Sequence, residues 1–361
     1  MDDIRENREG NKILIAASGT GGHLFPAIAT AEHLHNAIEW LGVPDRLETK
    51  LVPEQYPLHT VRMGGVQGKL GLSTVKTLVQ FLQATLAARR LLQKGQFCGV
   101  FTTGGYIAAP AIIAARSLGL PAALHESNAM PGKVTRWLSR WCSVVAIGFQ
   151  ETRQYLPQQT KTLWVGTPVR SQFLADSHVP LTDPVIPDGV PLVVVVGGSQ
   201  GAVSVNQLIR SAAPAWLESG AWIIHQTGTN DPDTQSLAHP HYIHRPFFDN
   251  VAALFQRATL VISRAGAGTL TELAMTGAPS ILIPYPFAAD DHQAYNAKAF
   301  GAVGASKVYR QADLDGETLR ERVLALLNAP EDLDSMRVAT QSLAVPDSAQ
   351  RLADLLQKMM G

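Results

Sequence analysis

The sequence predicts an α/β protein with two Rossmann-like, doubly wound domains that face a cleft. Short apolar runs, of the kind that form strands buried on both faces of a parallel sheet, alternate with helical segments along the chain. A proline-rich stretch interrupts this alternation near the middle, and the pattern then restarts, as it began, with an apolar run and a glycine loop. A length of 361 residues suits two such domains.

Composition narrows the class of protein. The chain is 46% hydrophobic and 17% charged, which is typical of a globular protein, and its polar N-terminus lacks the apolar core of a signal peptide. The formal net charge is zero, so a nucleic-acid partner has no overall electrostatic support. Cys98 and Cys142 lack a metal-type spacing, and we expect both to be reduced, as in a cytosolic protein.

The expected first domain, residues 1–178, opens with a strand at 13–17, a glycine loop at 18–23 and a helix over 26–38. The glycines fall at 19, 21 and 22, so this loop is not the dinucleotide-binding fingerprint. Repeated strand–helix units then predict a parallel sheet. Its further strands are expected at 99–103, 122–124, 143–146 and 162–165, with a helix at 108–118.

A long helix is predicted over 72–94. Its apolar residues recur at helical spacing, at positions 75, 78, 79, 82 and 86, and they are flanked by Lys76, Arg89, Arg90 and Lys94. The favoured interpretation is an amphipathic helix that packs on the sheet. The other interpretation is a helix that lies partly on a membrane surface.

Prolines at 180, 184, 187 and 191 predict a linker over 179–191, because proline fixes the backbone and removes a hydrogen-bond donor. The expected second domain, residues 192–345, begins with a strand at 192–196, the glycine loop 197–201 and a helix that ends before Pro214. Two further strands are expected at 222–225 and 242–245. The C-terminal segment, 346–361, contains an amphipathic helix that could pack on either domain.

The stretch 263–296 is the strongest candidate binding site. A strand at 259–263 runs into the glycine turn 265–268 and then a helix, whose first backbone N–H groups favour phosphate. The next strand, at 280–283, ends in a loop that carries polar residues at 290–293 and 296. Because open α/β sheets bind ligands at the carboxyl ends of their strands, this stretch predicts a nucleotide site.

Some candidate residues have two interpretations at this point. His23 is either a base that takes a proton from an acceptor hydroxyl or a cap of its own helix. Thr269 and Glu272 match a capping box, whereas a carboxylate at 272 could instead bind the two hydroxyls of a ribose.

The remaining polar candidates are also open. Thr20 and Ser199 carry either capping or phosphate-binding hydroxyls, and Arg170 is either a surface residue or a cation for a diphosphate. A metal site is disfavoured, because the acidic cluster at 290–292 has no third ligand in sequence reach and the acidic pair at 231 and 233 is read as a loop.

Seven segments together resemble the MurG family, the UDP-N-acetylglucosamine–N-acetylmuramyl-(pentapeptide) pyrophosphoryl-undecaprenol N-acetylglucosamine transferases. They are SGTGGHLFPA, TTGGYIAAPA, LHESNAMPGKVTR, VGTPVR, VVGGSQGAVSVNQ, FFDNVAALFQRATLVISRAGAGTLTELAMTGAPSILIPYP and DDHQAYNA. The resemblance spans residues 13–356 and implies the GT-B glycosyltransferase fold. No motif of the family is recognised between the residues in the forties and Gly64.

The resemblance also implies roles for particular residues. His23 matches the histidine proposed as the base. In the first domain, the residues implied to contact the donor are Thr20, Gly21, Gly22, Asn128 and Arg170. In the second domain, they are Ser199 on the diphosphate, Phe248 at the uracil through its backbone, Ala267, Gly268, Thr269, Leu270, Thr271 and Glu272 on the α-phosphate and ribose, and Gln293 on the sugar.

The implied reaction transfers N-acetylglucosamine from UDP-N-acetylglucosamine to the 4-hydroxyl of the muramyl sugar of lipid I. It forms lipid II for peptidoglycan synthesis and inverts the anomeric centre by direct displacement. Helix N-termini and Arg170 would stabilise the leaving UDP, so we expect no metal or other cofactor. The expected partner is an anionic membrane surface at the cytoplasmic face of the bacterial plasma membrane, where the chain is peripheral, and no nucleic acid.

Three other functions fit the same fold. They are another GT-B transferase with a lipid acceptor, such as a diacylglycerol galactosyltransferase, a UDP-N-acetylglucosamine 2-epimerase, and a non-catalytic sugar-nucleotide binding protein. An acceptor-dependent product separates the proposed transferase from the last two.

Overall fold

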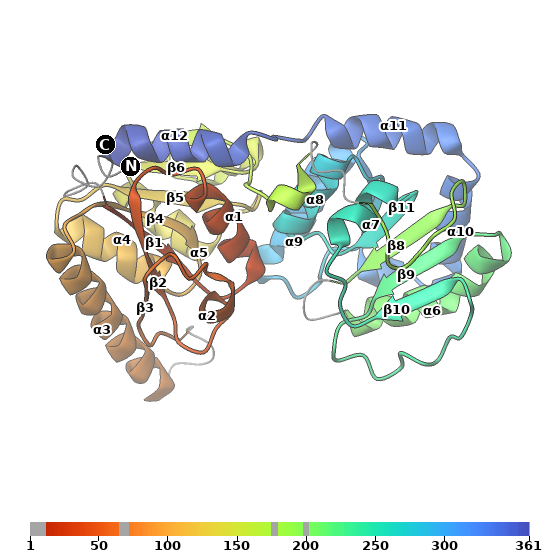
Figure 1. Ribbon diagram of the computed structural model, residues 1–361, viewed down its shortest axis with the longest axis horizontal. Coiled ribbons are helices and arrows are strands. Elements are labelled where there is room, and N and C mark those ends of the chain that lie inside the picture. The colour runs from red at the N-terminus through yellow and green to blue at the C-terminus, as the bar shows by residue number, and fades with distance from the viewer. Residues whose placement is uncertain (1–11, 65–71, 175–179, 198–201, 361) are drawn as a thin grey trace, which may run out of the picture. The chain divides into compact units, whose positions relative to one another are not determined.

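The computed structural model describes residues 12–64, 72–174, 180–197 and 202–360, with the side chains of the helix at 72–94 described from Thr77 onward. The chain forms two compact units, one of Met1–Arg170 with Asp347–Gly361 and the other of Ser171–Pro346. Each unit contains one parallel sheet, with helices packed against it (Figure 1). The predicted α/β class with two doubly wound domains is therefore confirmed.

The first unit is built on a seven-stranded sheet of order β3-β2-β1-β4-β5-β6-β7. Its strands are β1 (Lys12–Ala17), β2 (Ala37–Gly42), β3 (Leu58–Thr60), β4 (Phe97–Gly104), β5 (Ala122–Glu126), β6 (Val144–Ile147) and β7 (Thr162–Trp164). The chain order reverses beside β1, between β1 and β4, and the loops after these two strands therefore lie at the switch point where such sheets bind ligands.

Helices cover both faces of this sheet. They are α1 (Gly21–Ala31), α2 (Glu48–Leu51), α3 (Leu72–Lys94), α4 (Ala108–Ser117), α5 (Lys133–Leu138) and α12 (Ser348–Met360). Alternate residues of β1 serve the two faces: Ile13 and Ile15 pack with α1 and α12, whereas Leu14 and Ala16 pack with α3 and α4. The C-terminal helix thus completes the core of the first unit.

The expected helix over 26–38 is wrong at both ends. Helix α1 begins earlier, at Gly21, and ends at Ala31, while residues 37–42 form β2. The strand forms because Ile38 and Trp40, two residues apart, reach the same core, and the indole Nε1 of Trp40 donates to the carbonyl of Ala17 at 3.1 Å. Tertiary packing overrides the helical pattern here.

Helix α3 is confirmed and packs on the sheet, but not through the predicted stripe. Its described apolar residues Leu78, Val79, Leu82 and Leu86 are 47–58% exposed. The helix contacts the unit through its small and buried residues instead, Ala84, Ala88 and Leu92, which pack in the core shared with α4. Position 75 lies outside the described side chains. The predicted apolar stripe therefore faces away from the sheet.

The second unit has a six-stranded sheet of order β10-β9-β8-β11-β12-β13. Its strands are β8 (Leu192–Val196), β9 (Trp222–Gln226), β10 (Tyr242–Arg245), β11 (Leu260–Ser263), β12 (Ser280–Leu282) and β13 (Ser306–Val308). Its helices are α6 (Val203–Glu218), α7 (Val251–Arg257), α8 (Ala267–Thr276), α9 (His292–Ala302), α10 (Gly316–Leu327) and α11 (Pro330–Gln341).

Helix α6 does not end before Pro214, as expected, but continues to Glu218. The two residues that follow the proline in the last turn and point inward, Trp216 and Leu217, are buried in the core of the unit. Burying a tryptophan and a leucine contributes several kcal/mol, about as much as or more than an internal proline costs.

Candidate active site

The first glycine loop joins β1 to α1 in the first unit. Thr20 occupies the N-cap position of α1, but its hydroxyl makes no capping hydrogen bond and its side chain is exposed. Gly22 in the first turn is exposed as well. The backbone N–H groups at this helix end are thus not capped by a side chain, which suits a ligand with phosphate or sugar oxygens.

His23 is held in one orientation by the end of β4. Its Nδ1 lies 2.9 Å from the carbonyl oxygen of Thr103, and the Thr103 hydroxyl donates to the His23 carbonyl at 2.7 Å. A carbonyl can only accept, so Nδ1 carries the proton and Nε2 is the basic nitrogen of the neutral ring. The cap position belongs to Thr20, so the structure does not support the capping interpretation of His23.

Arg170 lies beside the same helix. Its guanidinium stacks on the ring of Phe25, 4.7 Å from the centroid, and the edge of that ring lies against Gly21. A Cβ built on Gly21 would approach the ring to 2.7 Å, so a larger residue there would displace the ring on which Arg170 stacks. The structure therefore brings Arg170 to the N-terminal turn of α1, together with the glycine loop, as the prediction of a diphosphate cation needs.

Asn128 is fixed by Glu126, a residue that is not among the predicted site residues. The Oε1 of Glu126 accepts from both the backbone N–H and the Nδ2 of Asn128, each at 3.0 Å. Its Oε2 accepts from the N–H of Gly132 at 3.0 Å and from the hydroxyl of Thr135 at 2.6 Å. One buried carboxylate thus shapes the whole loop after β5. The signal available in the sequence was an acidic residue at a strand end.

His125, one residue earlier, is buried and neutral. Burial lowers its pKa, although its Nε2 lies 2.9 Å from the carbonyl of Gly166. A proton on Nε2 is required by that contact, and the imidazole therefore joins the β5 and β7 ends without carrying charge.

The segment predicted to bind the α-phosphate and ribose begins helix α8 of the second unit. The N-cap is Gly266, with no side-chain hydrogen bond, so Thr269 lies inside the first turn. The capping-box interpretation of Thr269 and Glu272 is therefore wrong, because the helix starts earlier than that motif requires. Glu272 is half-buried in the next turn, and a Cβ on Gly268 would meet nothing within 4 Å.

The other segment residues hold this helix end in place. Leu270 is fully buried, Ala267 is nearly so, and the hydroxyl of Thr271 donates to the Ala267 carbonyl at 2.9 Å. The uncapped N–H groups at the start of α8 are thus carried on a packed helix, which suits an anionic ligand.

Side chains of helix α9 bind the backbone of Ala265, the residue before the N-cap of α8. The Oε1 of Gln293 accepts from the N–H groups of Ala265, at 3.1 Å, and Tyr285, at 2.9 Å. The Nδ2 of Asn296 donates to the carbonyl of Ala265 at 3.1 Å, and Asn296 is fully buried. Both lone pairs of the Gln293 oxygen are used, so a sugar hydroxyl would be met by its Nε2 amino group.

The predicted uracil position, Phe248, is buried rather than displayed. Its backbone N–H donates to the Oε1 of Gln226 at 3.1 Å, and the guanidinium of Arg245 lies 5.2 Å from its ring centroid. Gln226 ends strand β9, so β9 fixes this turn. These two contacts fasten the loop between β10 and α7 to the two strands β9 and β10.

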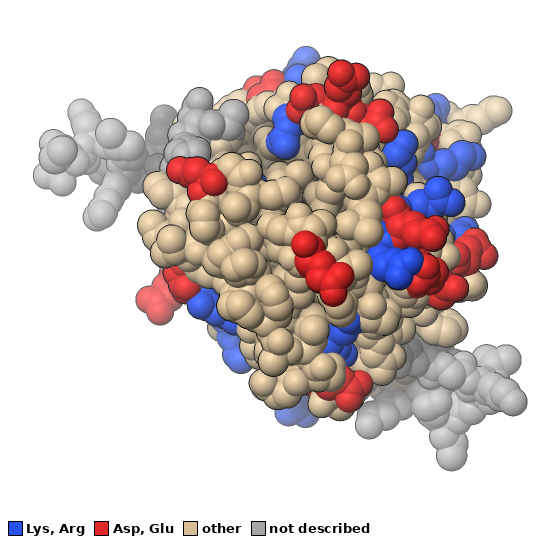
Figure 2. Space-filling model, turned by 90° about the vertical axis from the view of Figure 1, so that its right-hand side faces the viewer, with Lys and Arg blue, Asp and Glu red and all other residues tan. Residues whose placement is uncertain are grey.

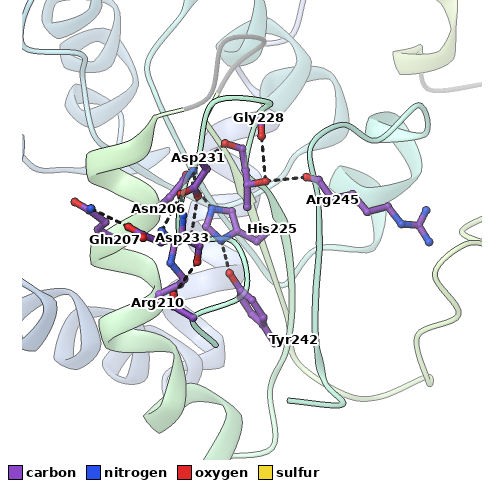
Figure 3. Close-up of polar contacts among 11 residues, drawn as sticks. Asn206, Gln207, Arg210, His225, Gly228, Asp231, Asp233, Tyr242 and Arg245 are labelled. Carbon is purple, nitrogen blue, oxygen red and sulfur yellow. Dashed lines mark hydrogen bonds and ion pairs between the residues drawn. The ribbon is translucent and has the colours of Figure 1, made fainter. Parts of the chain in front are cut away.

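The acidic pair at 231 and 233 belongs to a structural network (Figure 3). Arg210 of α6 binds Asp231 through two hydrogen bonds, at 2.7 and 3.1 Å, and the Nδ2 of Asn206 also donates to it at 2.7 Å. His225 bridges Asn206 and Tyr242, at 3.0 and 2.8 Å. The loop after β9 is thereby fastened to α6, and no group of metal ligands is found among the described residues.

Charge and burial set the protonation of this network. Burial raises the pKa of Asp231, but the hydrogen bonds from Arg210, from the backbone of Asp233 and from Asn206 outweigh burial. The pKa of this carboxyl is therefore lower than its usual value. Burial, together with the charge of Arg210, lowers the pKa of His225 to about 3. Asp231 is thus ionised and His225 neutral at neutral pH. Ser199, predicted on the diphosphate, lies outside the described residues.

The chain matches both domains of one family. The profile of the glycosyltransferase family 28 N-terminal domain matches residues 13–147, and that of the C-terminal domain matches residues 192–352. Two transferases that are named for N-acetylglucosamine transfer to N-acetylmuramyl-(pentapeptide) pyrophosphoryl-undecaprenol are 60% identical over 350 residues. That of Trichodesmium erythraeum (strain IMS101) matches over 97% of this chain and 92% of its own, and that of Trichormus variabilis over 97% and 98%.

Solved structures agree with this match. Acinetobacter baumannii MurG superposes with a TM-score of 0.78 at 32% identity, covering 97% of this chain and 100% of that one. A putative UDP-N-acetylglucosamine 2-epimerase from Listeria monocytogenes reaches 0.70 at 14% identity over 96% of each chain, which shows a shared fold alone. The expected GT-B fold and the family resemblance are confirmed. The chain belongs to glycosyltransferase family 28 and, within it, to the MurG family of UDP-N-acetylglucosamine–N-acetylmuramyl-(pentapeptide) pyrophosphoryl-undecaprenol N-acetylglucosamine transferases.

Proposed function

We propose that this chain transfers N-acetylglucosamine from UDP-N-acetylglucosamine to the 4-hydroxyl of the muramyl sugar of lipid I, with inversion, to form lipid II. The observation that carries the transfer is identity of 60% along 350 residues to relatives named for it. Identity of that extent covers both units, whereas the epimerase fold is matched at 14% only. The transfer to lipid I is therefore better supported than epimerase activity or sugar-nucleotide binding without catalysis.

His23 is the base in this proposal. As the 4-hydroxyl oxygen attacks the anomeric carbon and the bond to UDP breaks, Nε2 takes the hydroxyl proton. The Nδ1–H bond to the Thr103 carbonyl, 2.9 Å long, supports this role in two ways. It fixes the tautomer with a basic Nε2, and it stabilises the imidazolium that forms.

The donor is bound without a metal or another cofactor in this proposal. The uncapped N-terminus of α8 serves the α-phosphate, Glu272 the ribose hydroxyls and the Nε2 of Gln293 a sugar hydroxyl. Positive charge for the leaving UDP comes from helix N-termini and Arg170. Fixed donors of this kind perform the task that a divalent cation has in metal-dependent transferases.

A membrane surface is the proposed location of the acceptor. The exposed leucines of α3, Leu78, Leu82 and Leu86, precede Arg89 and Arg90 on the same helix, which suits anionic lipid. No described helix is both long and apolar enough to cross a bilayer. We place the chain peripherally on the cytoplasmic face of the plasma membrane. We propose no nucleic-acid partner, since the formal net charge is zero and acidic and basic side chains are interspersed on the face in Figure 2.

The test is an incubation with UDP-N-acetylglucosamine, with and without a lipid I analogue. We expect a disaccharide product and UDP release only when the analogue is present. Free N-acetylmannosamine or 2-acetamidoglucal formed without it would instead establish the epimerase. Binding of the donor without any product would leave a sugar-nucleotide binding protein.

A further inference from the structure

We propose that Glu48 is a positioning residue that sets the first glycine loop, and through it the N-terminus of α1 and His23. Glu48 begins the short helix α2 and is fully buried. Its Oε2 accepts from the backbone N–H of Gly19 at 3.1 Å, and its Oε1 accepts from the N–H of Val43 at 2.7 Å. One carboxylate thus joins the loop after β1 to the loop after β2.

A carboxylate in this position is not explained by ion pairing. In the part of the chain that the structure describes, its polar contacts are these two backbone N–H groups, and no lysine or arginine pairs with it. Removing an ionised carboxylate from water is costly unless hydrogen bonds compensate for it. The burial of Glu48 is therefore best understood by what the two bonds hold in place.

Gly19 is the residue whose backbone conformation the hydrogen bond to Glu48 restrains. Its φ is +102°, a conformation that only glycine adopts readily and that an unrestrained glycine leaves as readily. The bond from its N–H to Glu48 selects this conformation from the wide range open to glycine. The next residue, Thr20, is the N-cap of α1, so the direction of the helix start and its free N–H groups follow from Gly19.

The surroundings of Glu48 are shaped to the carboxylate. Gly42 provides the room, since a Cβ there would lie 2.7 Å from the Cγ of Glu48. On the same side, the indole of Trp40 donates to the carbonyl of Ala17, two residues before Gly19. Trp40 of β2 and Glu48 of α2 therefore hold the two ends of the segment 17–19.

The inference rests on the proposed function for its catalytic consequence, and one arm of the test does not. Glu48→Gln keeps the shape but offers one acceptor oxygen, so one N–H loses its partner. We expect amide hydrogen exchange in a peptide covering 17–24 to become about tenfold faster, the ratio that loss of one buried hydrogen bond produces. The circular dichroism spectrum should remain that of the wild type.

The matched control is Glu39→Gln. Glu39 is on the neighbouring strand, 17% exposed at its side chain, and bonds Lys12 and His59 at 2.6 and 2.7 Å without touching the loop. Exchange in 17–24 should be unchanged in this control. Unchanged exchange in Glu48→Gln as well would overturn the proposal.

The kinetic arm separates positioning from stability. With the lipid I analogue, Glu48→Gln should lower kcat about tenfold or more, because it displaces both the base and the N-terminus of α1. Donor KM should rise by a smaller factor, because the α8 segment still binds the nucleotide. A lower melting temperature with wild-type kcat would show a structural role only and reject the proposal. If the wild type proves not to be a transferase, the exchange arm still decides whether Glu48 sets the loop.

A second variant covers the case in which Glu48→Gln fails to fold. Gly42→Ala keeps the carboxylate but pushes it from its place, because the new Cβ would approach its Cγ to 2.7 Å. We expect the same faster exchange at 17–24 and the same fall in kcat. Wild-type exchange and turnover in folded Gly42→Ala would contradict the proposed mechanism.

Discussion

Gly104→Ala is the variant that most specifically displaces the proposed base. Gly104 follows the carbonyl that holds the His23 ring, and a Cβ built on it would lie 2.8 Å from both Nδ1 and Cε1 of that ring. Real Cβ atoms do not approach so closely, so the ring must move and its 2.9 Å contact with Thr103 must break. The glycine also has φ of +114°, where an alanine is strained by about 1–3 kcal/mol.

The expected effect on turnover follows from what a positioned base supplies. General base catalysis contributes about 10²–10⁴-fold, and a displaced imidazole loses much of it. We therefore expect kcat to fall by about 10²-fold or more, with donor KM little changed because the α8 segment is untouched. Steady-state kinetics with the lipid I analogue measure both quantities.

Gly119→Ala is the matched control. Gly119 also has positive φ, +72°, but a Cβ there would meet nothing within 4 Å. Both variants should melt at a lower temperature, whereas only Gly104→Ala should lose turnover. Equal kcat values in the two variants would refute the assignment of His23 as the base.

Three further predictions concern other parts of the chain. Burial lowers the pKa of His225 to about 3, below its value in the unfolded chain, so the stability that the neutral ring contributes is present above about pH 6.5 and is lost as the pH falls. Urea unfolding should therefore give a free energy of unfolding about 2 kcal/mol lower at pH 5 than at pH 7 from this group. His225→Asn should remove that pH dependence. Glu272→Ala should raise donor KM strongly while the melting temperature stays near wild type, and an unchanged KM would remove Glu272 from the ribose. Leu82→Gln with Leu86→Gln should abolish flotation with anionic liposomes, whereas Val338→Gln, 68% exposed in the second unit, should not.

Local patterns predicted most strands and the glycine loops, because buried parallel strands are continuous apolar runs. Strand β2 was missed because its residues continue a helical pattern, and only the core around Trp40 decides between the two. The stripe on α3 shares one helix face, as predicted, but that face is exposed rather than packed on the sheet. Periodicity shows that residues share a face and does not show what covers it.

The candidate site residues that lie in a contiguous motif could be predicted from the sequence. The residues that contact them from distant parts of the chain could not. His23 was found by the motif, yet its partner Thr103 is 80 residues away. Glu48 contacts Gly19 from 29 residues away, in the segment where no motif was recognised. The capping box failed for a local reason: Thr269 has the required spacing to Glu272, but Gly266 takes the cap position.

Product analysis distinguishes an inverting transfer to the muramyl sugar from the other reactions considered above. The donor sugar is α-linked to UDP, so one direct displacement yields a β-linked disaccharide. We predict that nuclear magnetic resonance of the product formed with the lipid I analogue shows a β linkage to the 4-position, with one UDP released for each disaccharide. An α-linked product, or UDP release that does not require the analogue, would rule out this transfer.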